Sequence, residues 1–328
     1  MDSHNIKDSI IVFLIDLVCN LYSENHHICD DDKIKIKNNI INKLQQKKII
    51  NVNSINIDET KSIIIKLLSN ELNNNQIENY NNYELIGNGS FSKVYKMFNP
   101  IDQINYAIKK IQIDDNYDQI LFEVRSMAKL NHTNIVRYHT SWIESDIINN
   151  NMITYNGFSN KYIFIQMELC KCNLYEYLLN NDLSYNDKII IIKQILNGLK
   201  YIHENEILHR DLKLENIFVA LDNSIKIGDF GLATTIYNIN YDDVGTDNYI
   251  APEVLNGKNY SYKSDLYSLG VIIMEILYNF TTKMEKIICI KNIKNGQFFI
   301  NHEITNIIRS LLDDNPENRL TIDNINFI

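Results

Sequence analysis

One stretch of the chain, residues 207–231, constrains the fold most because it spaces charged and amide side chains for chemistry on phosphate. It reads ILHRDLKLENIFVALDNSIKIGDFG. Asp211 lies where its carboxylate can accept or orient the proton of an attacking hydroxyl, and Lys213 can neutralise charge on a transferred phosphate. The stretch therefore predicts an active-site loop for phosphoryl transfer, with an ordinary loop and hairpin as the alternative.

The second half of this stretch predicts a β-hairpin. Two short apolar runs, residues 217–220 and 224–227, flank an Asp-Asn turn. A hairpin at this position returns Asp229 to the side of Asn216. An amide oxygen and a carboxylate are ligands that Mg²⁺ accepts beside ATP phosphates, because the ion keeps several of its waters. Asn216 and Asp229 are therefore the predicted metal ligands.

The motif HRDLKLEN followed by GDFG resembles the catalytic core of the protein kinases, and Lys213 is typical of their serine/threonine branch. The resemblance covers residues 81–328. It implies an α+β, two-lobed protein kinase fold, in which a small antiparallel β lobe with one long helix, residues 81–168, precedes a large helical lobe, residues 169–328. ATP and Mg²⁺ are the implied cofactors.

Residues 1–80 are similar to known kinases only loosely and are predicted to form a helical N-terminal regulatory segment. Apolar stretches alternate there with Asn-rich connectors, over residues 9–22, 33–46 and 58–72.

Residues 83–98, YELIGNGSFSKVYKMF, predict two strands joined by a glycine turn. Gly87 and Gly89 let backbone amides approach phosphates closely, whereas Ser92, where the motif has a third glycine, is expected to stiffen this lid. The kinase resemblance implies the contacts to ATP. The residues so implied are Ile86, Gly87, Asn88, Gly89, Ser90, Phe91, Ser92, Val94, Ala107, Lys109, Met167, Glu168, Cys170 and Phe218.

Within that set, the resemblance gives each part a role. Val94 and Ala107 would cover the adenine, Phe218 would lie beneath it, and Met167 would guard the back of its pocket. The backbone of Glu168 and Cys170 would pair with the purine, and Lys109 would hold the α and β phosphates.

Residues 118–130, DQILFEVRSMAKL, predict a helix whose inward side carries Glu123. By resemblance, Glu123 is the ion-pair partner of Lys109, although a solvated glutamate is the alternative and Asp118 offers a second carboxylate on the helix. The predicted catalytic residues are thus Asp211, Lys213, Lys109 and Glu123. The resemblance also pairs Glu253 with Arg319 and assigns Asp265 to hold the catalytic loop through backbone N–H groups.

Three segments are similar to a narrower group, the kinases of the α subunit of translation initiation factor two. They are LIDLVCNLYSEN at 14–25, NIVRYHTSWIE at 134–144 and YIFIQMELC at 162–170, and the first is closest to the haem-regulated inhibitor branch. The resemblance implies a cytoplasmic, stress-linked kinase that phosphorylates this α subunit and lowers translation. No cysteine of the N-terminal segment precedes proline, so the resemblance does not carry haem with it.

Two other functions remain open. One is a serine/threonine kinase of cell-cycle type with another protein substrate. The other is a pseudokinase scaffold, which has no chemical need for the full set of catalytic residues.

Substrate docking is expected near the segment NFTTKMEK, residues 279–286, which resembles the stretch before the docking helix of the family. Charge reversal at Lys283 and Lys286 is expected to weaken phosphorylation of the factor while sparing autophosphorylation. A homodimer through the N-lobe is a further expectation from the resemblance.

The segment between Asp229 and Glu253 is expected to be held by anions near Arg210. Asp242 and Asp243 follow Tyr241, the position where relatives carry a phosphothreonine. Their carboxylates would partly substitute for phosphate, with a solvated acidic turn as the alternative.

Composition excludes several partners. A formal net charge of -9 argues against broad nucleic-acid binding, which needs a basic face to displace counterions. The apolar run at residues 10–21 is about half the roughly 20 residues that a membrane helix needs, and Asp16 lies inside it. Five cysteines form no paired framework, so a reducing compartment is expected.

Overall fold

The computed structural model divides the chain into two compact units, Met1–Asn79 and Tyr80–Ile328. Of the first unit, only the short 3₁₀ helix η1, Gln76–Asn79, belongs to the described residues. The three N-terminal helices predicted from sequence lie outside them. The described residues are 76–89, 92–113, 117–145, 161–235, 249–257, 260–278, 280, 282–297 and 302–325.

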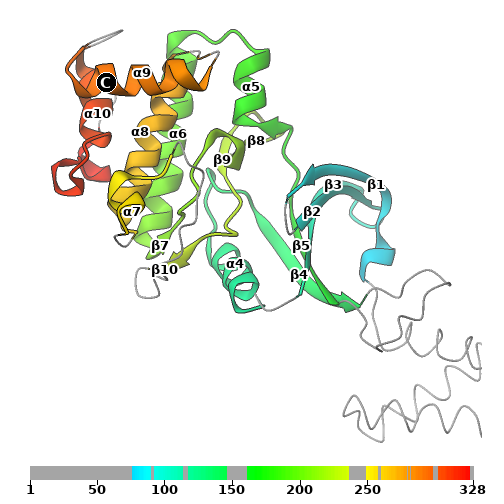
Figure 1. Cartoon of the computed structure of the whole chain (residues 1–328). Coiled ribbons are helices and arrows are strands. Elements are labelled where there is room, and N and C mark those ends of the chain that lie inside the picture. The colour runs from blue at the N-terminus through cyan, green and yellow to red at the C-terminus, as the bar shows by residue number, and fades with distance from the viewer. Residues whose placement is uncertain are drawn as a thin grey trace, which may run out of the picture. The chain divides into compact units, whose positions relative to one another are not determined.

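The second unit begins with a five-stranded sheet in the order β1-β2-β3-β5-β4 (Figure 1). Every neighbouring pair is antiparallel. The predicted strand at 134–144 begins later, because the backbone of Ile135 and Val136 pairs with Ile227 in a different sheet. The strands are β1 (Asn81–Asn88), β2 (Ser92–Asn99), β3 (Ile104–Gln112), β4 (Tyr138–Ser145) and β5 (Lys161–Glu168).

One helix, α4 (Tyr117–Lys129), lies beside this sheet and contacts β4 (Figure 1). Asp118 in its first turn and Lys129 in its last complement the helix dipole. Ile120 and Met127 are buried on the same face as Glu123, so packing of these two apolar residues turns the glutamate inward.

The larger lobe is helical, and three of its helices begin with capping boxes at Ser184, Ser261 and Thr282. In each box the cap side chain and the residue three positions on satisfy each other's backbone N–H groups. The helices are α5 (Leu174–Asn180), α6 (Tyr185–Glu204), α7 (Pro252–Leu255), α8 (Tyr262–Leu277), α9 (Lys283–Lys294) and α10 (His302–Leu311).

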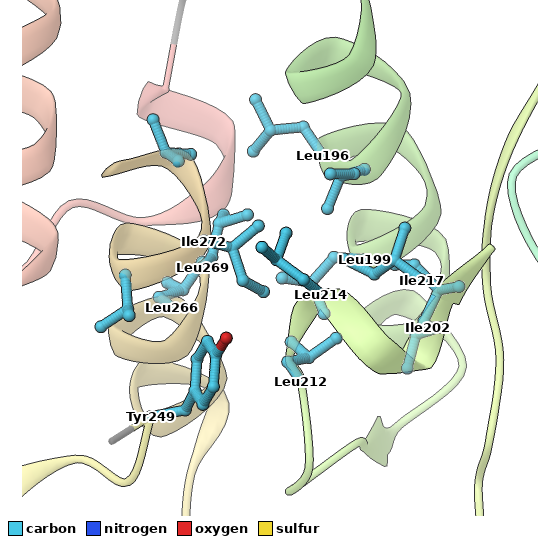
Figure 2. Close-up of a cluster of buried hydrophobic side chains, with 14 of the residues drawn as sticks. Leu196, Leu199, Ile202, Leu212, Leu214, Ile217, Tyr249, Leu266, Leu269 and Ile272 are labelled. Atoms are coloured by element: carbon cyan, nitrogen blue, oxygen red, sulfur yellow. The ribbon is translucent and has the colours of Figure 1, made fainter. Parts of the chain in front are cut away.

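Helix α8 is buried on nearly every side and forms the centre of this lobe. Figure 2 shows its residues Leu266 and Leu269 facing Leu199 of α6 and Leu214 of the catalytic stretch. On its other side α8 approaches α10 closely at Gly270, where an added Cβ would lie 2.8 Å from the Cβ of Leu311. Bulk at that position would push the two helices apart.

Two small sheets complete the lobe and frame the stretch that the sequence singled out. The predicted hairpin is present, and Asn223 in its turn adopts a φ of 68°, a conformation that asparagine tolerates. These strands are β6 (Cys172–Asn173), β7 (Ile207–Leu208), β8 (Ile217–Val219), β9 (Ile225–Ile227) and β10 (Thr234–Thr235); the short helices are η2 (Leu214–Asn216), η3 (Pro316–Asn318) and η4 (Ile322–Asn324).

The predicted fold class is confirmed. An antiparallel sheet with one long helix precedes a helical lobe, as the sequence indicated. Among the described residues, no helix combines the length and the apolar character needed to cross a membrane.

Candidate active site

The loop that carries Asp211 contains a residue in an unfavourable backbone conformation. Arg210 has a φ of 65°, and Asp265 of α8 holds this turn by accepting the backbone N–H groups of His209 and Arg210, both at 3.0 Å. Burial acts to raise the pKa of Asp265, but its hydrogen bonds to the His203 ring and to the backbone N–H of His209 outweigh burial and hold the pKa below its ordinary range. The carboxylate therefore stays ionised and keeps accepting these bonds.

His209 links the loop to the end of the hairpin. It is fully buried, and its Nδ1 accepts the backbone N–H of Asp211 at 3.3 Å. Because Nδ1 is an acceptor, the ring proton lies on Nε2, which donates to the carbonyl of Gly228 at 3.0 Å. This bond fixes the carbonyl of Gly228 and therefore the position of the Asp229 backbone that follows it.

The side chains of Asp211, Lys213 and Asn216 converge. Lys213 Nζ lies 2.7 Å from Asp211 Oδ2, and Asn216 Nδ2 donates to the same oxygen and to the Asp211 carbonyl, each at 2.8 Å. The Asp211 carboxylate is 11% exposed. Two donors thus fix its rotamer, which is a requirement for aiming a carboxylate at a hydroxyl group.

A second cluster joins the two lobes at Lys109. Its Nζ lies 2.7 Å from Glu123 Oε1 and 2.8 Å from Asp229 Oδ1. Burial opposes the charge on Lys109, but the two carboxylates outweigh burial, so its pKa is raised. The same ammonium lowers the pKa of Asp229. The partner that the structure gives to Lys109 on α4 is therefore Glu123, which is 4% exposed.

Asn216 and Asp229 fit the chemistry of a magnesium site. Asn216 Nδ2 is held by Asp211, which leaves Oδ1 as the side-chain atom able to bind a cation. The backbone N–H of Gly228 donates to the Asn216 carbonyl at 2.9 Å and brings Asp229, whose carboxylate is 44% exposed, next to it. One amide oxygen and one accessible carboxylate are a sufficient protein share for a cation that also takes phosphate and water oxygens.

Several residues predicted to contact ATP are brought together by sheet register. Val94 lies opposite Lys109, and Ala107 lies opposite both Lys96 and Met167. In the turn between β1 and β2, Gly89 donates its backbone N–H to Ser92 at 2.9 Å. Ile86 and Asn88 belong to β1, whereas Ser90 and Phe91 lie outside the described residues.

Phe218 belongs to β8 of the helical lobe and touches the hairpin's end. An added Cβ on Gly228 would lie 2.8 Å from Val136 Cγ2 and 3.0 Å from the Phe218 ring, so a larger residue there would force these neighbours to shift. The predicted floor of the adenine site is thus placed beside the residue that precedes Asp229.

Glu168 and Cys170 lie in the segment that leads from β5 into the helical lobe. The N–H of Glu168 donates to the Arg137 carbonyl at 2.9 Å, so this N–H is already used within the protein. Burial, followed by the charge of Glu168, raises the pKa of the Cys170 thiol to about 12.

Sequence reasoning missed Lys226. Its Nζ lies 3.2 Å from Glu168 Oε2 and donates to the Thr133 carbonyl at 3.0 Å, so it ties β9 to the end of β5 and to the segment between α4 and β4. The available signal was a lysine between two isoleucines in a buried strand, which requires a partner for its charge.

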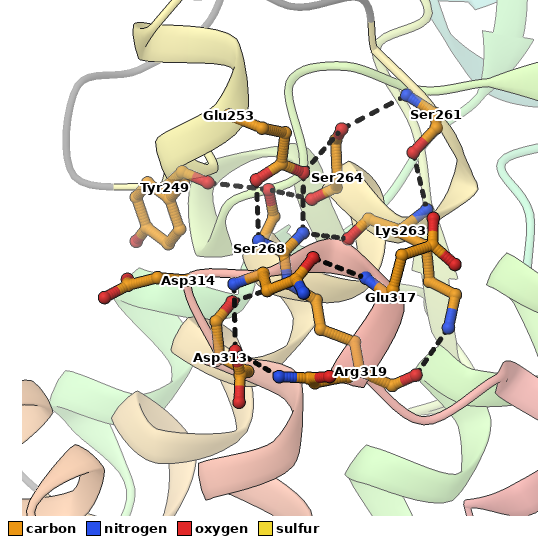
Figure 3. Close-up of polar contacts among 12 residues, drawn as sticks. Tyr249, Glu253, Ser261, Lys263, Ser264, Ser268, Asp313, Asp314, Glu317 and Arg319 are labelled. Atoms are coloured by element: carbon orange, nitrogen blue, oxygen red, sulfur yellow. Dashed lines mark hydrogen bonds and ion pairs between the residues drawn. The ribbon is translucent and has the colours of Figure 1, made fainter.

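Outside the catalytic cluster, Arg319 and Glu253 form the predicted pair. Arg319 Nη1 and Nη2 bind the two carboxylate oxygens at 2.7 and 2.6 Å, and Arg319 also donates to the carbonyls of Lys263 and Asp313 (Figure 3). Ser264 Oγ adds a bond to Glu253 at 3.2 Å. The pair fixes the segment after residue 248 to the C-terminal part of the lobe.

Comparison with known proteins agrees with this architecture. A family model described as the protein kinase domain matches residues 80–326. The interferon-induced, double-stranded RNA-activated protein kinase of Mus musculus is 37% identical over 252 residues, which cover 73% of this chain and 48% of that protein. The eIF-2-alpha kinase GCN2 of Arabidopsis thaliana is 31% identical over 293 residues, with coverages of 71% and 23%.

A third relative is the serine/threonine-protein kinase atg1 of Dictyostelium discoideum, 32% identical over 256 residues, with coverages of 72% and 36%. The two lobes and the cluster around Asp211 define a phosphoryl-transfer site. The chain belongs to the protein kinase family, in its serine/threonine branch. It spans about half the length of the mouse relative.

Replacing Lys109 by methionine is expected to lower phosphoryl transfer strongly. The change removes the cation shared by Glu123 and Asp229, and it leaves the buried Glu123 carboxylate without that partner. Steady-state phosphorylation of a generic basic protein measures the effect. Lys93→Met, on β2 and exposed, is the matched control and is expected to behave as wild type; equal activity of the two variants would contradict the role of Lys109.

Proposed function

We propose that this chain uses ATP and Mg²⁺ to phosphorylate the α subunit of translation initiation factor two, and so lowers translation under stress. The observation that carries the proposal is the similarity to an eIF-2-alpha kinase over 71% of the chain, together with a complete cluster of Lys109, Glu123, Asp211 and Asp229. The cytoplasm is the proposed location.

The side chains divide the work of the reaction. Asp211, fixed by Lys213 and Asn216, orients the substrate hydroxyl and takes its proton, while Lys213 offsets charge on the moving phosphoryl group. Lys109, held by Glu123, binds the α and β phosphates. Magnesium, bound by Asn216 and Asp229, would neutralise charge on the phosphate oxygens.

The nucleotide would lie between the sheet and β8. Val94 and Ala107 are the proposed apolar cover, and Phe218 is the proposed floor. Met167 would guard the back of the pocket. The backbone of Glu168 and Cys170 would pair with the purine edge.

The organisation of the whole chain is also a proposal. Residues 1–80 would be a helical regulatory segment in front of the kinase domain, residues 81–328, and the closest functional relative would be the haem-regulated inhibitor branch. The proposal includes a homodimer through the N-lobe. It includes neither direct binding of nucleic acid nor binding to a membrane.

Helix α9 is the proposed docking element for the substrate. It exposes Met284, Ile287 and Ile288, an apolar row at the spacing of one helix face. The side chain of Lys286, in contrast, is only 7% exposed and is paired with Glu275 at 2.7 Å. Lys286 therefore does not present its charge to a partner surface, because its ammonium is buried and paired, and the effect of charge reversal at this position stays a prediction. The side chain of Lys283 lies outside the described part of the structure.

The decisive test is phosphorylation of recombinant α subunit by the purified full chain with labelled ATP. A generic basic protein serves as the second substrate. A kcat/KM for the α subunit at least about 100-fold above that for the basic protein is expected, because docking adds binding energy that the basic protein cannot supply. Comparable values for both would contradict the proposed substrate and leave the kinase activity standing.

A second candidate is a serine/threonine kinase with another protein substrate. The similarity to atg1, a serine/threonine-protein kinase whose name mentions no initiation factor, favours this candidate. It would be recognised by labelling of the basic protein without labelling of the α subunit. A pseudokinase is disfavoured, because a scaffold does not need Asp211 and Lys213 held 2.7 Å apart.

A further inference from the structure

Two buried residues, Tyr249 and Lys286, and the partly buried Glu275 meet between α8, α9 and the segment that follows residue 248. Tyr249 Oη donates to Glu275 Oε2 at 2.7 Å, and Lys286 Nζ donates to Glu275 Oε1 at 2.7 Å. The Lys286 ammonium also lies 3.9 Å from the centre of the Tyr249 ring. Each of the three residues therefore contacts both others, and each comes from a different element.

Tyr249 connects this cluster to the catalytic loop. Burial, and next the Glu275 carboxylate, raise the pKa of Tyr249, whereas the backbone of Leu214 acts to lower it. Leu214 follows Lys213 directly and belongs to the same hydrophobic core cluster as Tyr249 (Figure 2). The Tyr249 carbonyl is held as well, because Ser268 Oγ donates to it at 2.8 Å.

We expect this cluster to fix the position of α9 more than to raise the stability of the lobe. Taking two charges out of water costs about as much as their attraction returns, so a buried pair contributes little net stability. Such a pair instead fixes the relative position of the two elements that carry it, because separating the two charges inside the protein costs much free energy. Lys286 lies on the inner side of α9, while Met284, Ile287 and Ile288 face outward.

We propose that Lys286, through Glu275 and Tyr249, fastens α9 in a fixed orientation relative to the catalytic loop, and so positions a protein substrate docked on α9. Lys286 is thus a positioning residue and not a docking contact. The inference rests on the proposed use of α9 for docking, and it adds the means by which a docking helix distant from Asp211 keeps its register with the reacting groups.

The kinetic test compares Lys286→Met with Lys286→Arg in the full chain. Loss of the ammonium is expected to raise KM for the α subunit about tenfold, a typical coupling between two sites, with kcat and the KM for ATP unchanged. Activity on a short basic peptide, which does not reach α9, should not change. The arginine variant keeps the charge and is expected to restore KM toward its wild-type value.

The matched control is Lys200→Met, which removes an exposed ion pair with Asp323 elsewhere in the lobe. It is expected to leave every parameter at the wild-type value. A Lys286→Met variant that lowers kcat on the short peptide as much as on the α subunit would overturn the inference, since the lysine would then support the lobe in general.

Amide hydrogen exchange tests the fastening without any substrate. Lys286→Met is expected to speed exchange in α9 and in residues 249–257 together, while α10 stays protected. Tyr249→Phe, which keeps the ring but removes the bond to Glu275, should speed exchange in the same two segments. Faster exchange in α9 alone would overturn the coupling. If wild type fails to label the α subunit, the proposed substrate is lost, but this exchange result still decides whether the fastening exists.

Discussion

Replacing Asp211 by asparagine is expected to lower phosphoryl transfer by ~10²–10⁴-fold, the usual contribution of a positioned general base. The amide has the same shape as the carboxylate but cannot take the proton of the attacking hydroxyl. ATP affinity should stay near wild type, because Lys109 and Asp229 belong to a separate cluster. Single-turnover labelling and nucleotide titration measure the two quantities separately.

The control for this change is Asp222→Asn in the turn of the neighbouring hairpin. Asp222 accepts bonds from Ser224 and takes no part in the cluster around Lys213. The control variant should label substrate at the wild-type rate. Near wild-type turnover by Asp211→Asn would show that this loop is not where the reaction occurs.

Replacing Arg319 by methionine is expected to lower the free energy of unfolding by about 3–5 kcal/mol, since it leaves a buried carboxylate without its partner. The Arg319 side chain is 0% exposed and that of Glu253 is 5% exposed, so water cannot take over the lost bonds. Two carbonyls, of Lys263 and Asp313, lose their donor as well. Denaturant titration followed by fluorescence of the single tryptophan, Trp142, and by circular dichroism gives the value.

Lys96→Met is the comparison for this prediction, since it removes an exposed pair with Glu84 whose side chains are 39% and 61% exposed. Such a pair contributes little because water solvates both charges. If Arg319→Met and Lys96→Met unfold at the same denaturant concentration, the bidentate pair has no structural role. A smaller loss for Glu253→Gln, which keeps one acceptor oxygen for Arg319, would agree with the proposed cause.

Local sequence rules predicted the parts of the site that lie close together in the chain. The Asp-Asn turn sets the hairpin of β8 and β9, and the hairpin alone brings Asp229 beside Asn216. The inward face of α4 likewise follows from the spacing of Ile120, Glu123 and Met127. These outcomes depend on backbone periodicity and turn chemistry, which a single sequence contains.

The residues that sequence missed depend on contacts between distant elements. From sequence, Lys286 is predicted to be an exposed docking charge, because α9 carries lysines and isoleucines on several faces. Lys286 turns inward because it pairs with the carboxylate of Glu275 on α8, a contact that the sequence of α9 does not contain. Lys226 is buried for the same kind of reason, since its partner Glu168 lies in another sheet. Pairing across elements leaves no periodic signal in either segment.

The partly buried thiol of Cys170 has a consequence for chemical probes of this protein. A cysteine on the segment expected to contact adenine invites electrophilic ligands that form a covalent bond with sulfur. Such reactions proceed through the thiolate, and with a pKa of about 12 only about one molecule in 10⁵ carries it at pH 7. Slow alkylation of Cys170 therefore follows from its surroundings, and reversible ligands suit this segment better than irreversible ones.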